Sequence, residues 1–465
     1  MQSIKSWVKR IGRRYWAPAA LQHPGLAPAH WGLAYESGAL SYSGVVLADL
    51  LKRWGSPLHV VFPEKLLRNL AGFQSSGLEV FYSYKTNPLP WIFSLLHKNG
   101  AGAEVISAYE LWLALKLGVA PDKIIYNGPA KTDDSLRMAI ESGIASINVN
   151  NMEELEVIAA MASRMGKVAN IGVRVTSSQG WTGQFGFPVE SGAAKEAYRR
   201  ALELPSLNVV ALHCHRGALI SNVDTLTGHL RFMLEFAQTL HSAFGWWPKL
   251  LDVGGSLATP STRYLGSREI KLATTFLVPP KAPDLNDSLL PDTYAQVVVE
   301  TVGKFCTAHG QAVPRLVCEV GRSLTGNAQM LLSSVLNTRA GDDFDYAVMD
   351  AGVSVASIVT NEYHEFFPLQ QRSEPKRCHR VVGPICHMGD TLYMVQYQPP
   401  LHKGDGVAIM DSGAYFIADA ASFSFAQPAV VALHSDGHQT LIRHAETNEH
   451  LISLDEYETL APNPQ

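Results

Sequence analysis

A lysine ends one apolar, aromatic stretch of the sequence, since Lys85 closes the run FYSYK and is followed by Thr-Asn-Pro. A lysine in a strand that faces a protein interior costs free energy unless its amine is neutralised, paired or covalently bound. Burial also lowers the pKa of such an amine and makes it a nucleophile, which suits a Schiff base. A lysine that reaches solvent or pairs with an acid is the alternative interpretation of this residue alone.

An acid and a base flank a glycine at the end of a second apolar run, LVCEVGRSL, which contains Glu319, Gly321 and Arg322. A carboxylate beside a pyridine nitrogen keeps that nitrogen protonated, and the cationic ring then accepts electrons from a carbanion. The glycine lets backbone N–H groups approach a phosphate, which the arginine can neutralise. A buried ion pair between Glu319 and Arg322 explains the same residues without a ligand.

Glycines and histidines follow two further runs. Gly254 and Gly255, in LDVGGSL, either cradle a phosphate with their amides or make a tight turn. His213 and His215, in HCHRG, lie on the same side of a strand by its period of two, so one of them could stack on a flat cofactor ring. A histidine satisfied within the core is the alternative. The sequence shows no third ligand, HExxH motif or carboxylate cluster beside them, and we therefore expect no metal.

The elements that must position these residues alternate along residues 58–326. Short runs rich in Val and Ile are separated by helix-like stretches, as in repeated βα units around a parallel sheet. About eight such units predict a (β/α)8 TIM-type barrel, which places chemistry at the carboxyl ends of its strands. The runs are LHVVF, EVFYSY, AGAEVIS, KIIYN, SINVN, NIGVRV, VVALHCH, LLDVGG and LVCEV.

The rest of the chain predicts a second domain. Beyond residue 326 the helical period fades, and MLLSSVLNTRA, YAVMDAG, GVAIMDSGAYFIA and AVVALHS predict strands of a C-terminal β-domain over 327–465. Residues 1–57 lack the barrel pattern, and we expect them to contribute to that β-domain. The segment 263–292 contains a Pro-rich stretch and predicts an inserted loop, either a lid or plain surface.

Composition limits the classes of function. The chain has 465 residues, of which 46% are hydrophobic and 17% are charged, and its net charge of −4 argues against nucleic acid as a partner. Apolar stretches all fall short of the roughly 20 residues of a membrane span. Five cysteines without a CxxC pair favour a reducing, cytoplasmic location. The basic N-terminus lacks the apolar core of a secretory signal and predicts a solvated or oligomer-contacting helix.

Taken in order, the motifs YKTNP, GAEVIS, YNGPAKT, HCHRG, DVGG, EVGR, DAG, GPICHMGD and SGAY resemble those of the fold type III pyridoxal-phosphate decarboxylases. This group includes ornithine, diaminopimelate and arginine decarboxylases, and its barrel is similar to that of alanine racemase. The resemblance runs from about residue 60 to about residue 425. It implies pyridoxal 5'-phosphate as cofactor and decarboxylation of an amino acid, either a diamino acid or its conjugate, through an external aldimine and a quinonoid.

The resemblance also implies a role for each motif residue. Lys85 would bind the cofactor covalently, Glu319 would contact its ring nitrogen and His215 would stack on its ring. The other implied cofactor contacts are Glu104, Arg174, Gly254, Gly255, Gly321, Arg322 and Tyr415. A homodimer with shared active sites is implied as well, in which Cys386 acts as a catalytic group in the partner's site. The implied contacts to the small-molecule substrate are Asp350, His387 and Asp390.

Some positions depart from the family pattern. His387 stands where diaminopimelate decarboxylases place an acid that binds the distal amine of their substrate, and the stretch after Asp350 lacks their Arg-Pro. Ser256 replaces a third glycine, and Ala218 replaces a phosphate-binding serine. We therefore expect a substrate that is neutral or anionic at its distal end, such as an acylated or citrate-linked diamino acid.

Two other functions fit part of the pattern. An amino-acid racemase shares the barrel and the lysine, but it needs a second base on the opposite ring face and tends to pair the ring nitrogen with arginine. Glu319 and Cys386 therefore favour decarboxylation. A non-catalytic protein similar to antizyme inhibitor would also share the fold, and the presence of Lys85, Glu319, Arg322 and Cys386 argues against it.

Overall fold

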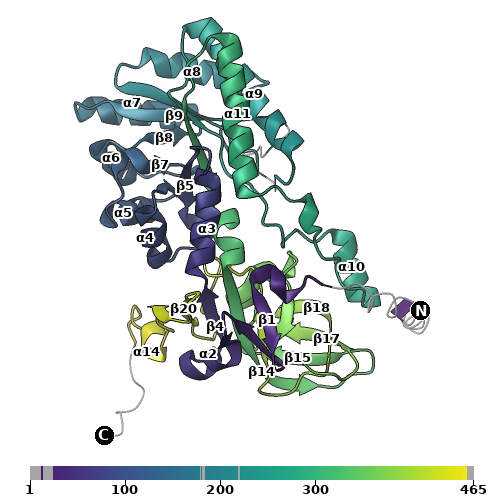
Figure 1. Ribbon diagram of the computed structural model, residues 1–465. Coiled ribbons are helices and arrows are strands. Elements are labelled where there is room, and N and C mark those ends of the chain that lie inside the picture. The colour runs from purple at the N-terminus through teal and green to yellow at the C-terminus, as the bar shows by residue number, and fades with distance from the viewer. Residues whose placement is uncertain (1–11, 14–24, 179, 181–183, 218–219, 458–465) are drawn as a thin grey trace, which may run out of the picture. The chain divides into compact units, whose positions relative to one another are not determined.

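The computed structural model describes residues 12–13, 25–178, 180, 184–217 and 220–457, and it divides into two compact units (Figure 1). The barrel unit comprises residues 63–263 and 283–328. The β-unit comprises the described parts of 1–62, 264–282 and 329–465. The basic N-terminal segment expected to be helical lies outside the described residues, apart from residues 12 and 13.

Eight parallel strands in the described part of the barrel unit close into a barrel, in the order β9-β11-β12-β13-β5-β6-β7-β8, with β8 pairing back to β9. A short strand, β10 (Phe187–Pro188), pairs in parallel with the carboxyl end of β9. The closed parallel sheet confirms the predicted (β/α)8 fold class. The barrel strands are β5 (Glu79–Ser83), β6 (Gly102–Val105), β7 (Ile124–Tyr126), β8 (Ser146–Val149), β9 (Ala169–Thr176), β11 (Leu207–His213), β12 (Leu250–Asp252) and β13 (Arg315–Val320).

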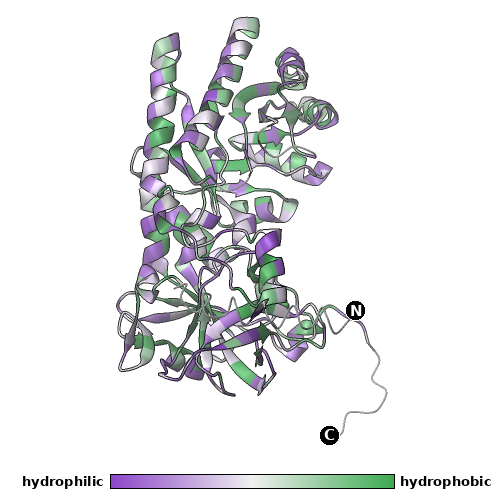
Figure 2. Cartoon of the chain, turned by 90° about the vertical axis from the view of Figure 1, so that its right-hand side faces the viewer, coloured by the Kyte–Doolittle hydropathy of each residue, from purple (hydrophilic) through white to green (hydrophobic). Residues whose placement is uncertain are grey.

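Helices alternate with these strands and lie outside the barrel, as Figure 1 shows. Local signals set their ends: the Asn222 side chain caps the start of the longest one, and Gly245 ends it in a left-handed conformation. Figure 2 shows apolar segments gathered inside each unit, while the helices are banded. The helices are α3 (Pro63–Gln74), α4 (Pro90–Lys98), α5 (Ala108–Lys116), α6 (Asp133–Ser142), α7 (Met152–Arg164), α8 (Ala193–Glu203), α9 (Val223–Phe244) and α11 (Pro291–His309).

The β-unit contains a mixed sheet in the order β18-β17-β15-β14-β4-β20-β21, and β19 joins β14 to β16. Strand β4 (Leu58–Val61) pairs antiparallel with β14 and parallel with β20. The expectation that LHVVF is a barrel strand is therefore wrong. All four residues of β4 are buried, and such a run has the same apolar pattern as a parallel barrel strand. The other strands are β14 (Gln329–Arg339), β15 (Asp345–Met349), β16 (Phe366–Pro368), β17 (Arg377–Val382), β18 (Thr391–Gln398), β19 (Gly406–Ile409), β20 (Ala429–Leu433) and β21 (Gln439–Arg443).

Two further segments belong to the β-unit. The N-terminal part forms a small sheet of β1 (Leu33–Glu36), β2 (Ala39–Tyr42) and β3 (Val45–Val46), followed by helix α2 (Leu47–Trp54). The segment predicted as an insertion carries helix α10 (Ser267–Phe276), and the Leu265 amide donates to the Asn361 carbonyl at 2.8 Å. Among the described residues, no helix is long and apolar enough to cross a membrane.

Candidate active site

The inward side chains of the barrel strands form two layers. The first is largely apolar, and the second, two residues further along each strand, is a polar ring. The apolar layer includes the buried cluster of Phe81, Ile125, Ala211, Leu250 and Val317. Because strand side chains alternate, the next inward residue of every strand lies nearer its carboxyl end. These residues are all polar and buried, and the ring consists of Ser83, Glu104, Asn127, Asn148, Arg174, His213, Asp252 and Glu319.

One amide connects the two glutamates of the polar ring. The Asn127 Nδ2 atom donates to Glu104 Oε1 at 2.9 Å and to Glu319 Oε1 at 2.5 Å. The Ser83 hydroxyl donates to the second oxygen of Glu104 at 2.5 Å. Because two carboxylates face the same end of its amide, Asn127 must turn its NH2 group toward them. Its carbonyl oxygen is then available to accept a hydrogen bond from another member of the ring.

The orientation of Asn127 determines which nitrogen of His213 carries a proton. Asn148 Nδ2 donates to the Asn127 carbonyl oxygen at 2.8 Å and also contacts His213 Nδ1 at 3.0 Å. The NH2 group of Asn148 can only donate, so His213 Nδ1 must accept. The ring proton then lies on Nε2, which is 3.4 Å from Glu319 Oε2. Asn127 thus donates to one oxygen of the Glu319 carboxylate, and the His213 Nε2 atom lies near the other oxygen without a hydrogen bond to it.

A second acid, Asp252, lies near this carboxylate. Burial alone would raise the pKa of Glu319, but the nearby His213 and Asp252 side chains outweigh it, so the pKa is lowered. Burial and the negative charge of Glu319 raise the pKa of Asp252 well above its ordinary value. We infer that the pair holds one proton on Asp252 and that Glu319 stays ionised at neutral pH.

Lys85 lies just beyond β5, in a short 3-10 helix formed by Tyr84–Thr86. Its side chain is exposed, whereas Tyr84 and Thr86 on either side are buried. The expectation of a lysine within the buried strand is therefore wrong, because the strand ends at Ser83 and the chain turns. The amine lies at the carboxyl end of the barrel, where a ligand can reach it.

His215 is fixed as a neutral ring by its neighbours. Desolvation, followed by the charge of Lys85, lowers the pKa of His215 to about 3. The Gly255 amide donates to His215 Nδ1 at 3.2 Å, so the proton lies on Nε2, 3.0 Å from the Ser256 hydroxyl. Ser256 has a φ of 76°, a conformation that costs a non-glycine residue roughly 1–2 kcal/mol. The contact with His215 gives a reason for serine at a position that suits glycine.

Three glycines and an arginine form a cradle at the ends of β12 and β13. A Cβ atom at Gly254, Gly255 or Gly321 would lie within 2.9 Å of atoms of other residues, so only glycine fits this close backbone. Arg322, which is buried, begins the short helix α12 (Arg322–Thr325). A backbone-lined cradle beside a buried guanidinium suits a phosphate group. Ala218, predicted to replace a phosphate-binding serine, lies outside the described residues.

The remaining predicted residues lie in the β-unit. Asp390 is buried, and its carboxylate accepts the amides of Val353 and Ile385, each at 2.8 Å. Both of its oxygens therefore hold the loop that carries Cys386, which favours a positioning role over direct contact with substrate. Asp350, which follows β15, accepts the Ser334 amide at 2.9 Å.

The loop between β17 and β18 presents its side chains to solvent. Cys386 and His387 are both exposed, and Met388 is fully exposed. Tyr415 follows β19 and has a φ of 68°. The predicted strand GVAIMDSGAYFIA accordingly ends at Ile409, before this residue.

Sequence reasoning missed the roles of Asn148 and Asp252. The sequence signal for them was a polar residue two positions after an inward-facing apolar residue, near the end of a strand. Five of the barrel strands show this pattern. Asp252, His213 and Glu319 also offer ligand atoms within 4.8 Å of one another, an arrangement that a metal ion could use. The absence of a metal therefore stays a prediction.

Comparisons with known proteins agree with this geometry. The family model described as "Pyridoxal-dependent decarboxylase, pyridoxal binding domain" matches residues 64–326. Diaminopimelate decarboxylase of Aquifex aeolicus is 28% identical over 438 residues, which cover 91% of this chain and 97% of that protein. The enzyme of the same name from Methanocaldococcus jannaschii is 29% identical over 443 residues, which cover 90% of this chain and 95% of that protein.

A solved structure is similar over nearly the whole chain. The M. jannaschii diaminopimelate decarboxylase in complex with L-lysine has a TM-score of 0.81 and 27% identity, and the match covers 92% of this chain and 98% of that chain. The similarity thus extends over both units.

We expect Asp252→Asn to change how stability depends on pH. The raised pKa of Asp252 favours its protonated form in the native protein, whereas in the unfolded chain it ionises above its ordinary pKa of 3.8. The wild-type protein should therefore lose stability as pH rises above this value, by up to about 1.4 kcal/mol per pH unit, whereas the asparagine variant should not. Urea midpoints should diverge in favour of the variant as pH rises above about 5. Asp455→Asn, at an exposed position, is the control, and parallel curves for Asp252→Asn would refute the shared proton.

Proposed function

This chain belongs to the pyridoxal-dependent decarboxylase family, and on that premise we propose that its substrate is a diamino acid, or a conjugate of one, with a neutral or anionic distal end. The protein uses pyridoxal 5'-phosphate to decarboxylate an amino acid to the amine. The observation that carries this chemistry is the buried Glu319 carboxylate, which accepts a hydrogen bond from Asn127 and lies 3.4 Å from His213 Nε2.

The residues at the strand ends fit the cofactor. We propose that Lys85 binds it covalently, that Gly254, Gly255, Gly321 and Arg322 hold its phosphate, and that Tyr415 adds to this contact. The neutral His215 ring, fixed by Gly255 and Ser256, provides a flat face for stacking. Glu104 and Arg174, which are buried in the polar ring, complete the set.

The chain's own groups control protons and charge. When bound, pyridoxal phosphate supplies the electron sink for the pair left by loss of CO2. We propose that Glu319 holds a proton on the ring nitrogen, which an ionised carboxylate does best. Cys386 is proposed to return a proton to the substrate Cα, and Asp390 keeps its loop in place through the Ile385 and Val353 amides.

We further propose a cytoplasmic homodimer with shared sites. The support for shared sites is the exposure of Cys386 and His387 on one loop of the β-unit, while the cofactor residues other than Tyr415 belong to the barrel unit. The support for the location is that all five cysteines are free. Asp350 and His387 would contact the distal end of the substrate.

The first test of this function is Glu319→Gln. The amide cannot hold the ring proton, so kcat for CO2 release should fall about 100-fold or more, while bound cofactor, measured by absorbance, is retained. Glu319→Asp is the matched control, because it keeps the charge and should retain more activity than the amide variant. Unchanged turnover in Glu319→Gln would favour a racemase-like mechanism instead.

Shared sites can be tested by complementation. Lys85→Ala and Cys386→Ala should each be inactive alone, but mixed dimers would contain one intact site. If the subunits exchange randomly, the mixture should recover up to about a quarter of wild-type activity. Tagged subunits establish that exchange has occurred, and a mixture that exchanges yet stays inactive would mean that each chain builds its own site.

Substrate choice can be tested at His387. An acid at this position binds a distal ammonium through a charge-assisted hydrogen bond, so His387→Glu should raise kcat/KM for free ornithine and lysine about tenfold relative to their acylated or citrate-linked forms. Met388→Glu places the same charge one residue away and should have a smaller effect. A wild-type enzyme that prefers free ornithine or lysine to every conjugate contradicts this proposal.

A further inference from the structure

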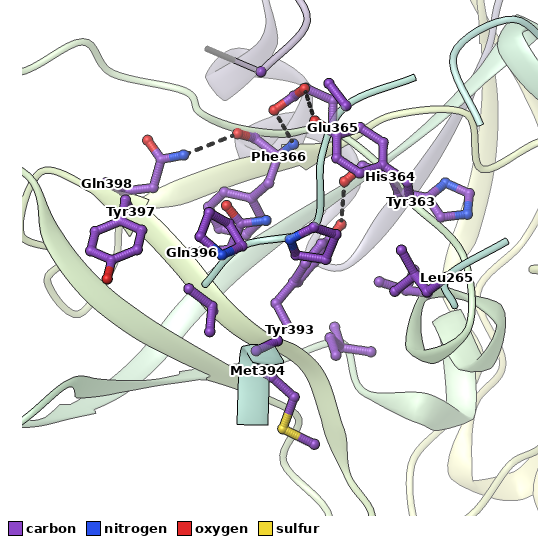
Figure 3. Close-up of a pocket in the computed structure, with 18 of the residues that line it drawn as sticks. Leu265, Tyr363, His364, Glu365, Phe366, Tyr393, Met394, Gln396, Tyr397 and Gln398 are labelled. Atoms are coloured by element: carbon purple, nitrogen blue, oxygen red, sulfur yellow. Dashed lines mark hydrogen bonds between the residues drawn. The ribbon is translucent and has the colours of Figure 1, made fainter. Parts of the chain in front are cut away.

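A cavity of about 370 Å³ lies wholly within the β-unit. One wall is strand β18, and another is the stretch 359–368 that includes β16 (Figure 3). The third wall comes from the segment predicted as an insertion, through Ile270 and Ala273 of α10 and through Pro279 and Pro280. Its volume lies in the range of small-molecule sites. The insertion is therefore part of the wall of a possible ligand site.

Aromatic rings line much of this cavity, and hydrogen bonds fix their positions. The Tyr393 hydroxyl donates to the His364 carbonyl at 3.2 Å, as Figure 3 shows, and its ring packs edge-on against Phe366. The Tyr397 hydroxyl donates to the Leu277 carbonyl at 3.1 Å. Fixed rings of this kind pack against methylene groups and attract a cation to their faces.

The charged groups of the walls are mainly acidic. Glu365 is buried, and one of its oxygens accepts the Tyr363 hydroxyl and the Leu26 amide, each at 2.6 Å. Among the described residues, its other oxygen accepts a long contact of 3.5 Å from the Phe366 amide. These donors are all neutral, and burial raises the pKa of Glu365, followed by repulsion from Asp411. A cation would compensate this carboxylate better than the neutral donors do.

The other ionisable residues that line the cavity leave its charge mainly acidic. Glu362 is also buried, and its carboxylate lies 3.5 Å from His364 Nε2. Lys376 is the one lysine or arginine among the described lining residues, and it is exposed. The cavity thus combines aromatic walls with two buried acids and favours a positively charged ligand with an apolar chain.

We propose that this cavity is a second ligand site that binds an organic amine. The choice of amine rests on the proposed function, because decarboxylation of an amino acid releases a product that carries an ammonium group on its chain. Such a ligand matches both the aromatic rings and the acids of the walls. The insertion supplies one wall, so amine binding would stabilise α10 against β18.

The test measures binding of 1,5-diaminopentane to the holoenzyme by titration calorimetry. The wild-type protein should bind one equivalent per chain, in the cavity, because the active site is proposed to favour a neutral or anionic distal end. The neutral 1,5-pentanediol and the anionic glutarate should bind the cavity at least tenfold more weakly. No binding of the diamine by the wild type, or equal binding of the diol and the diamine, overturns the proposal.

Two variants at adjacent positions locate this equivalent. Ile270→Trp fills the cavity from α10 and should remove it while CO2 release is retained. Lys271→Trp places the same ring on the exposed side of that helix and should keep it. Loss of the equivalent in both variants, or in neither, places it outside the cavity and overturns the proposal.

Charge recognition is tested separately at Glu365. Glu365→Gln should weaken diamine binding in the cavity at least tenfold and leave diol binding unchanged. Equal weakening of both ligands would mean that the carboxylate only shapes the wall. Failure of the proposed function is distinguishable, since an enzyme that releases no CO2 but binds amine in the cavity would lose the function and keep the site.

Discussion

An ionised carboxylate inside a closed barrel is the constraint around which the barrel interior is arranged. Burying such a charge costs several kcal/mol unless hydrogen bonds replace the lost water. Asn127 donates to one oxygen of Glu319, His213 Nε2 lies 3.4 Å from the other, and each of these side chains can take only one orientation. Each side chain therefore fixes the orientation of the next one. Asn148 selects the His213 tautomer without touching Glu319.

Much of the fold could be predicted from the sequence because barrel strands and helices differ in period. The eight runs from EVFYSY to LVCEV became the closed barrel, so the fold class followed from them, whereas the cofactor followed from the resemblance of the motifs to a known family. The run LHVVF was assigned to the barrel in error. A strand that is buried on both faces is a mainly apolar run, whether it belongs to the barrel or to the sheet of the β-unit. Pairing with β14 and β20 decides the sheet, and no local sequence feature encodes that pairing.

Less of the candidate site could be predicted. Motif order indicated Glu319, His215 and the glycines, because these residues stand at strand ends. It could not indicate that Asp252 holds the proton of Glu319, since that depends on which strands become neighbours. The buried Asp390 shows the same limit, because only the folded loop reveals that the chain's own amides use both of its oxygens.

The pairing of β4 bears on how the chain folds during synthesis. Strand β4 leaves the ribosome early, but its partners β14 and β20 are made only after all the barrel strands. The apolar strand β4 therefore stays unpaired while the barrel forms. Its contacts with β14 and β20 join segments that are distant in sequence, and such contacts form slowly. Nascent chains that stall before β14 would expose β4 as a template for aggregation, so chaperone demand should depend on the rate of translation through the barrel.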